Sequence, residues 1–184
     1  AAASNRGCEV TIVEAAAAPL IRGLGVEMGE ACGDLHREHA VGLRLGVGIA
    51  SVLGSDEVEG VQLTDGSQLF ADLVVVGIGA HPNTEWLKGS GLQLDDGIVC
   101  NGTMNAGVPG VYAIGDVAGP PMLAHKAEHE GVICIEKIAG LVAHPMDKNQ
   151  IPGCTYCHPQ IASVGLTEAK AKEAGYEVNV GRFP

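Results

Sequence analysis

The sequence predicts an α/β fold, and three observations support this prediction. Short apolar, β-branched runs alternate with segments of helical periodicity up to a polar linker at 143–153. Hydrophobic residues make up 46% and charged residues 18% of the chain, a balance typical of a globular protein with a core. Glycine occurs 27 times, often where an apolar run ends, as tight turns after buried strands require.

The N-terminal half is predicted to hold several strands and one helix. Residues 8–14 (CEVTIVE) form an apolar, β-branched run typical of a buried strand, and 25–40 have the apolar spacing of a helix. Two more strand regions follow, at 42–54 and 58–79. The second contains Asp65-Gly66, a hairpin signal. Its end, 72–79 (DLVVVGIG), predicts a buried central strand because it is apolar and breaks at glycines.

The C-terminal half is predicted to contain one long helix between short strands. This helix runs from about Pro121 to Leu141, with prolines in its first turn and Gly140 near its end. The polar, proline-bearing stretch 143–153 indicates a domain boundary. The remaining expected elements are short helices at 83–91 and 167–175 and strands at 97–100, 111–114, 154–157, 160–165 and 176–180.

Composition argues against several classes of partner. The net charge of −11 leaves no basic face for nucleic acid. No apolar run reaches the roughly 18 residues that a membrane span needs. Four cysteines in apolar surroundings are expected to be core thiols of a protein in a reducing compartment: Cys8, Cys32, Cys100 and Cys134. With no leader visible at the first residue, we expect a cytoplasmic protein, and both ends suggest a fragment.

Glu14 lies at the end of a predicted strand. In dinucleotide-binding folds, an acid about 20 residues after a glycine fingerprint accepts hydrogen bonds from the adenosine ribose. The fingerprint would precede residue 1, so a solvated strand-end acid is an equal alternative. If the motif is real, NAD is favoured over NADP, because a carboxylate repels a 2′-phosphate and 15–18 (AAAA) supplies no cation.

Two further motifs have a metal or haem interpretation. Residues 125–129 (HKAEH) match a zinc-peptidase pattern, with two imidazoles on one helix face. Residues 154–158 (CTYCH) match the attachment signature of c-type haem, and could also be a redox pair or half of a zinc site. A strand would point Cys154 and Cys157 to opposite faces, which favours plain strand cysteines. A metal or haem module remains the alternative function of a different class.

The stretch 109–125 (PGVYAIGDVAGPPMLAH) places a carboxylate, Asp116, between an apolar strand and a helix N-terminus. The carboxylate suits a polyol hydroxyl, and the N-terminal amides suit a ring that gains negative charge on reduction. A flavin has both parts. We therefore expect Asp116 and the start of the helix to face one cavity large enough for a flavin ring.

Residues 111–119 (VYAIGDVAG), with 71–87 (ADLVVVGIGAHPNTEWL) before them, resemble the FAD-dependent pyridine nucleotide–disulfide oxidoreductases. Residues 1–100 are most similar to ferredoxin or rubredoxin reductases, and from Val108 on the chain is similar to dihydrolipoamide dehydrogenase. The resemblance implies a truncated or hybrid Rossmann-like flavoprotein with two dinucleotide-binding domains. The implied domains are an NAD-binding domain at 1–77 without its glycine-rich first βα unit, the C-terminal part of an FAD-binding domain at 78–150, and the beginning of a dimerisation domain at 151–184.

The resemblance also implies cofactor contacts. Asp116, preceded by Gly115 in the motif, would hydrogen-bond the ribityl hydroxyls of FAD. Glu14 would bind the adenosine ribose of NAD, and Gly79 and Ile49 would lie along the NAD. Backbone groups of four residues would face the pyrimidine end of the isoalloxazine: Met122, Leu123, Ala124 and His125.

The implied activity is NAD-linked hydride transfer to and from FAD. Electrons would be exchanged with a dithiol or disulfide, as on a lipoyl-bearing protein, or alternatively with a small iron–sulfur protein. Members form homodimers. The family's FAD glycine fingerprint, its redox-active Cys-x4-Cys and its His–Glu acid/base motif have no counterpart here, so no catalytic residue can be named. We expect the chain alone to be inactive and to bind FAD poorly.

Overall fold

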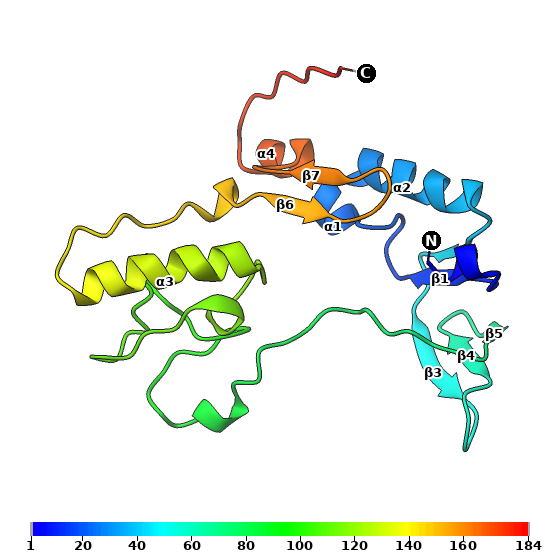
Figure 1. Ribbon diagram of the computed structural model, residues 1–184, viewed down its shortest axis with the longest axis horizontal. Helices are drawn as coiled ribbons and strands as arrows, with labels where there is room; N and C mark the ends of the chain where they lie inside the picture. Colours follow the sequence, from blue (N-terminus) through cyan, green and yellow to red (C-terminus); the bar gives the residue numbers. More distant parts are fainter. Residues whose placement is uncertain (1, 184) are drawn as a thin grey trace. The chain divides into compact units, whose positions relative to one another are not determined.

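The computed structural model describes residues 2–183 (Figure 1). The chain divides into two compact units, one of the residues up to Gly77 with those from Leu166 onward, the other of Ile78–Gly165. Within the described range, no helix is both long and apolar enough to cross a membrane. Besides the elements introduced below, the structure has a short helix α1 (Ile21–Leu24) and the 3-10 turns η1 (Ser4–Arg6) and η4 (Lys148–Gln150).

The first unit begins with a parallel strand–helix–strand arrangement. Strand β1 (Thr11–Glu14) pairs in parallel with β2 (Gly42–Leu45), and helix α2 (Val26–Glu38) connects them. The helix buries Gly29, Cys32 and Gly33. Val26, the first residue of the helix, is 56% exposed. The buried face is formed by small residues, and a Cβ on Gly29 would lie 2.7 Å from the Pro19 carbonyl oxygen, so the preceding chain lies close to the helix there. The parallel pair confirms the α/β class.

An antiparallel three-stranded sheet follows in the same unit. Strands β3 (Ile49–Leu53), β4 (Gly60–Leu63) and β5 (Gln68–Phe70) lie in the order β3-β4-β5, with β4 in the centre (Figure 1). The predicted hairpin at Asp65-Gly66 is confirmed, since this turn joins β4 to β5. Val47, Val61 and Leu63 form the core of the sheet, and Val74 packs against it.

The prediction of a buried strand at 72–79 is wrong for this structure. The segment forms no strand, and Val75 and Ile78 are 85% and 90% exposed. A buried parallel strand needs a hydrogen-bonded neighbour and helices over both faces. Among residues 2–183, no strand pairs with this run, so its apolar side chains stay in solvent except at Val74.

The second unit is organised around a small apolar core and one long helix. The core contains Leu87, Ile98, Ala106, Ala113 and Ala118. The expected strands at 97–100 and 111–114 are reduced to isolated bridges, because neither segment finds a continuous partner within the described residues. The short helix expected at 83–91 is a 3-10 turn, η2 (Glu85–Leu87).

Helix α3 (Ala124–Ile138) confirms the long predicted helix. It begins at Ala124 rather than Pro121, because Leu123 keeps an extended backbone with φ −135° and ψ 135°. The 3-10 turn η3 (Gly115–Ala118) precedes it in the chain, separated from it by residues 119–123, and packs against α3. The antiparallel pair β6 (Gly153–Thr155) and β7 (Ile161–Ser163) belongs to the same unit.

The C-terminal segment returns to the first unit. Helix α4 (Glu168–Glu173) is confirmed, but the strand expected at 176–180 is absent, since nothing pairs with this stretch in the described chain. Arg182 binds Glu27 of α2 through two hydrogen bonds of 3.0 and 2.8 Å. Because β6 and β7 group with the second unit and α4 with the first, the division at 150/151 into a separate domain stays a prediction.

Candidate flavin and nucleotide sites

The first candidate site is the turn η3, where Asp116 follows Gly115. Gly115 has φ 75°, a left-handed conformation that favours glycine, and it aims the following residue away from the core. The Asp116 side chain is exposed, and among residues 2–183 no donor hydrogen-bonds its carboxylate. The oxygens of this carboxylate are therefore available to a ligand hydroxyl.

A buried ion pair lies behind this turn. Lys126 and Glu130, four residues apart on α3, are 0% and 1% exposed, and Lys126 Nζ lies 3.0 Å from Glu130 Oε1. The buried ammonium group of Lys126 thus pairs with Glu130 and not with Asp116. Neither residue was predicted from the sequence, although the spacing of the apolar residues along α3 points to both. Lys126 and Glu130 precede the buried Ile133 and Cys134 at the spacing of one helix face.

The four residues expected at the flavin ring form the start of α3. Met122, Leu123 and His125 are half-buried, and Ala124 is exposed. The first turn of any helix leaves amide N–H groups without helical acceptors, and these groups can bind an electron-rich ring. His125 Nε2 lies 2.9 Å from the Pro152 carbonyl oxygen, so its ring is held as a hydrogen-bond donor to the backbone.

A pocket of about 270 Å³ borders the end of the turn η3, at Ala118. Its lining includes Cys100, Ala118, Pro120, Glu130 and Lys148. Burial raises the pKa of the half-buried Cys100 thiol, because the thiolate would lose hydration there. Asp116 does not line this pocket, so the pocket does not meet our expectation of a cavity shared by Asp116 and the start of α3.

The expected NAD residues lie on separate elements. Glu14 is the last residue of β1, as predicted, and its Oε1 accepts the Ala16 N–H at 2.8 Å. Ile49 begins β3 and is 46% exposed. Gly79 lies outside any strand, exposed, with φ 97°. No hydrogen bond joins the three within the described chain, and their place along one nucleotide stays a prediction.

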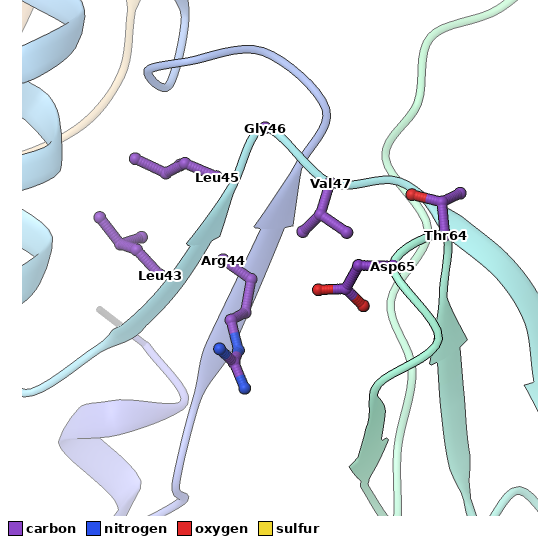
Figure 2. A pocket seen from close by; sticks show the side chains of 7 residues that line it. All are labelled: Leu43, Arg44, Leu45, Gly46, Val47, Thr64 and Asp65. Carbon is purple, nitrogen blue, oxygen red and sulfur yellow. The ribbon is translucent and has the colours of Figure 1, made fainter.

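Figure 2 shows an open pocket of about 440 Å³ at the end of β2, lined by Leu43, Arg44, Leu45, Gly46, Val47, Thr64 and Asp65. The Arg44 and Asp65 side chains point into the same space on one side of β2, while Leu43 and Leu45 point to the other (Figure 2). Hydrogen bonds from Ser67 lower the pKa of the Asp65 carboxyl, and the charge of Arg44 adds a smaller effect. None of the expected NAD residues lines this pocket.

The cysteine and histidine motifs do not gather into a metal site. Among residues 2–183, no group of three or more His, Cys, Asp or Glu side chains is placed to hold a metal ion. Cys154 lies in β6, and the Cys157 thiol donates to the Pro159 carbonyl oxygen at 2.9 Å. Cys8, expected in a core, is exposed, because it precedes β1 and nothing described packs over it.

Comparisons with family profiles and with individual proteins point to the same protein family. A sequence profile described as pyridine nucleotide-disulphide oxidoreductase matches residues 1–131, and the profile of that family's dimerisation domain matches 151–184. The chain is 57% identical over 129 residues to a dihydrolipoyl dehydrogenase of Rhizobium etli, which covers 67% of this chain. It is 39% identical over 189 residues to the mitochondrial dihydrolipoyl dehydrogenase 1 of Arabidopsis thaliana, across 97% of this chain.

Solved structures agree with this result. A ferredoxin reductase of Rhodopseudomonas palustris superimposes with a TM-score of 0.80 at 29% identity, over 91% of this chain and 44% of that one. The reductase–putidaredoxin complex gives a TM-score of 0.77 at 30% identity, over 87% and 41%. The chain spans only 27% and 36% of the length of the two dehydrogenases.

Proposed function

Because the chain belongs to the pyridine nucleotide-disulphide oxidoreductase family, whose members use FAD and NAD(H), we propose that it forms part of an NAD-linked flavoenzyme of the dihydrolipoyl dehydrogenase type. The observation that carries this proposal is the Gly115–Asp116 turn, which lies within the matched residues. The turn packs against the 15-residue helix α3, and its Asp116 carboxylate has no hydrogen-bond donor among residues 2–183.

The residues present fit an FAD site of which they would form one side. Asp116 would accept hydrogen bonds from the ribityl hydroxyls, because its carboxylate has no donor within the described chain. Backbone groups of Met122, Leu123, Ala124 and His125 would orient the pyrimidine end of the ring. When bound, the flavin supplies the hydride and electron transfer, and these residues supply orientation and electrostatics.

Glu14 fits the ribose end of NAD. It ends a parallel strand, and ligands of open α/β sheets bind outside the carboxyl ends of such strands. One carboxylate oxygen accepts the Ala16 N–H, which fixes the side chain and leaves its other oxygen for a ribose hydroxyl. We propose that Ile49 and Gly79 lie along the same nucleotide.

The electron partner has two candidates. The 57% identity to a dihydrolipoyl dehydrogenase favours a dithiol, carried by a lipoyl-bearing protein. The structural likeness to a ferredoxin reductase favours a small iron–sulfur protein as the alternative. Assay of the protein that contains this chain separates them, since NADH oxidation would depend on lipoamide in the first case and on ferredoxin in the second.

Residues 151–184 match the family's dimerisation domain, and we propose that they contribute to a homodimer in the protein that contains them. The exposed thiols of Cys8, Cys154 and Cys157 suit a reducing, cytoplasmic location. We expect this chain alone to be inactive, because it spans about a third of its relatives' length and holds one side of the proposed flavin site.

Titration with FAD, followed by amide chemical shifts in an NMR spectrum, tests the proposal even at millimolar affinity. We expect shifts at η3 and at the start of α3. Asp116→Asn should weaken binding by about tenfold or more, since it removes a charged acceptor. Glu128→Gln, which removes a charge from the exposed face of α3, serves as the control and should bind like the wild type. Equal affinity of the wild type and Asp116→Asn would contradict the assignment.

A further inference from the structure

The Lys126–Glu130 pair does more than join two side chains of α3, because both partners also bind Gly115. The Gly115 N–H donates to Glu130 Oε2 at 2.7 Å, and Lys126 Nζ donates to the Gly115 carbonyl oxygen at 3.0 Å. Lys126 Nζ also lies 3.1 Å from Glu130 Oε2. The two side chains of the ion pair therefore hydrogen-bond both peptide groups of Gly115, one on each side of its Cα.

Stability alone gives little reason for this arrangement. Burying two charges carries a desolvation penalty, and apolar residues of similar volume are often equally stabilising. The positions belong to the buried face that Ile133 and Cys134 continue, where apolar side chains would pack well. What apolar side chains could not do is hold both peptide groups of Gly115, whose φ of 75° sets the direction of the next residue.

We infer that Lys126 and Glu130 are positioning residues for the flavin site: by fixing Gly115 they hold the Asp116 carboxylate toward the ribityl chain of FAD. This inference rests on the proposed function. The pair acts through Gly115 and Asp116, and it makes no contact with the cofactor. Because both partners lie on α3, the helix N-terminus that faces the ring and the carboxylate that faces the ribityl chain are held in one fixed geometry.

The test uses two charge-neutral double variants, because removal of one partner would leave a buried unpaired charge. Lys126→Met/Glu130→Leu removes both contacts to Gly115. Lys126→Met/Glu130→Gln keeps an amide oxygen for the Gly115 N–H and serves as the conservative variant. FAD and NADH are titrated separately by NMR, with circular dichroism as the check on folding.

We expect Lys126→Met/Glu130→Leu to weaken FAD binding about tenfold, because it removes both hydrogen bonds to Gly115. Lys126→Met/Glu130→Gln should lose less affinity, because it removes one of these hydrogen bonds and keeps the other. NADH affinity should stay unchanged in both, because Glu14 and Ile49 lie in the other unit and the hydrogen bonds of Lys126 and Glu130 do not involve Gly79. Adding Asp116→Asn to the leucine variant should cause no further loss. This non-additivity distinguishes positioning of Asp116 from a general structural role.

The outcomes separate the two claims. If Asp116→Asn weakens FAD binding but the folded leucine variant does not, the inference is overturned and the proposed function stands. Additive losses from Asp116→Asn and the leucine variant also overturn it. If the wild-type chain shows no FAD-dependent shifts at η3 and the start of α3 even at millimolar FAD, the proposed function is lost and the inference is lost with it. The exposed i,i+4 pair Glu168–Lys172 supplies the control, and Glu168→Gln/Lys172→Met should leave both affinities unchanged.

Discussion

Lys126→Met as a single substitution should destabilise the second unit strongly. Glu130 is 1% exposed, and its charge is balanced by Lys126. Among the described residues, the variant would leave this buried carboxylate with the Gly115 N–H as its one remaining donor. Removal of one partner of a buried pair costs about 3–5 kcal/mol. Lys126→Met/Glu130→Leu should recover most of this loss, because no charge then remains buried, although two peptide groups of Gly115 lose their partners.

Amide hydrogen exchange of Ile133 and Cys134 is a suitable assay, because both are buried on α3 beside the pair. A loss of about 3–5 kcal/mol corresponds to exchange roughly two to four orders of magnitude faster in the single variant. Lys172→Met on α4 removes a comparable i,i+4 partner in solvent and should leave exchange within α4 unchanged. If Lys126→Met changes amide exchange as little as Lys172→Met does, Glu130 does not depend on Lys126 to balance its buried charge.

Two further predictions concern the packing of α2 and the reactivity of a thiol. Gly33→Ala should stabilise the protein by about 1 kcal/mol through helix propensity, since a Cβ there meets no atom closer than 3.5 Å. Gly29→Ala should destabilise it by about 1–3 kcal/mol, since its Cβ would lie 2.7 Å from the Pro19 carbonyl oxygen. Urea unfolding measures both changes in stability. Alkylation by iodoacetamide at pH 8 should modify exposed Cys8 well before Cys100, because burial raises the pKa of the Cys100 thiol and so lowers its thiolate fraction; faster reaction at Cys100 would contradict this.

The elements that the sequence predicted correctly are those whose signals are local. The β-branched run that ends at Glu14, the turn at Asp65-Gly66 and the helix from Ala124 each depend on residues close in the chain. The apolar run 72–79 depends instead on partners. Its composition is that of a buried strand, but a strand exists only where another strand can hydrogen-bond to it, and sequence composition does not report that neighbour.

The candidate site was predictable in the same uneven way. Asp116 was predicted from its place between an apolar run and a helix. The structure exposes its side chain, but Asp116 lines neither of the two pockets described above, so its role at a flavin stays a prediction. Lys126 and Glu130 were missed because opposite charges four residues apart usually indicate a solvated helix face. Extending the apolar stripe of Ile133 backwards along the helix would have found both, since burial follows the stripe and not the charge.

The exposed run after β5 has a practical consequence for work with this chain in isolation. The side chains of Leu73, Val75, Val76 and Ile78 are 66–90% exposed, and no strand of the described chain pairs with this run. Its peptide groups are therefore open to pairing with another molecule. Uncharged, valine-rich segments without proline are the type that assembles into intermolecular β-structure. At the concentrations that NMR requires, this segment is where we expect the chain to aggregate first. A charged substitution at Val75 should keep the protein monomeric without altering either unit's core.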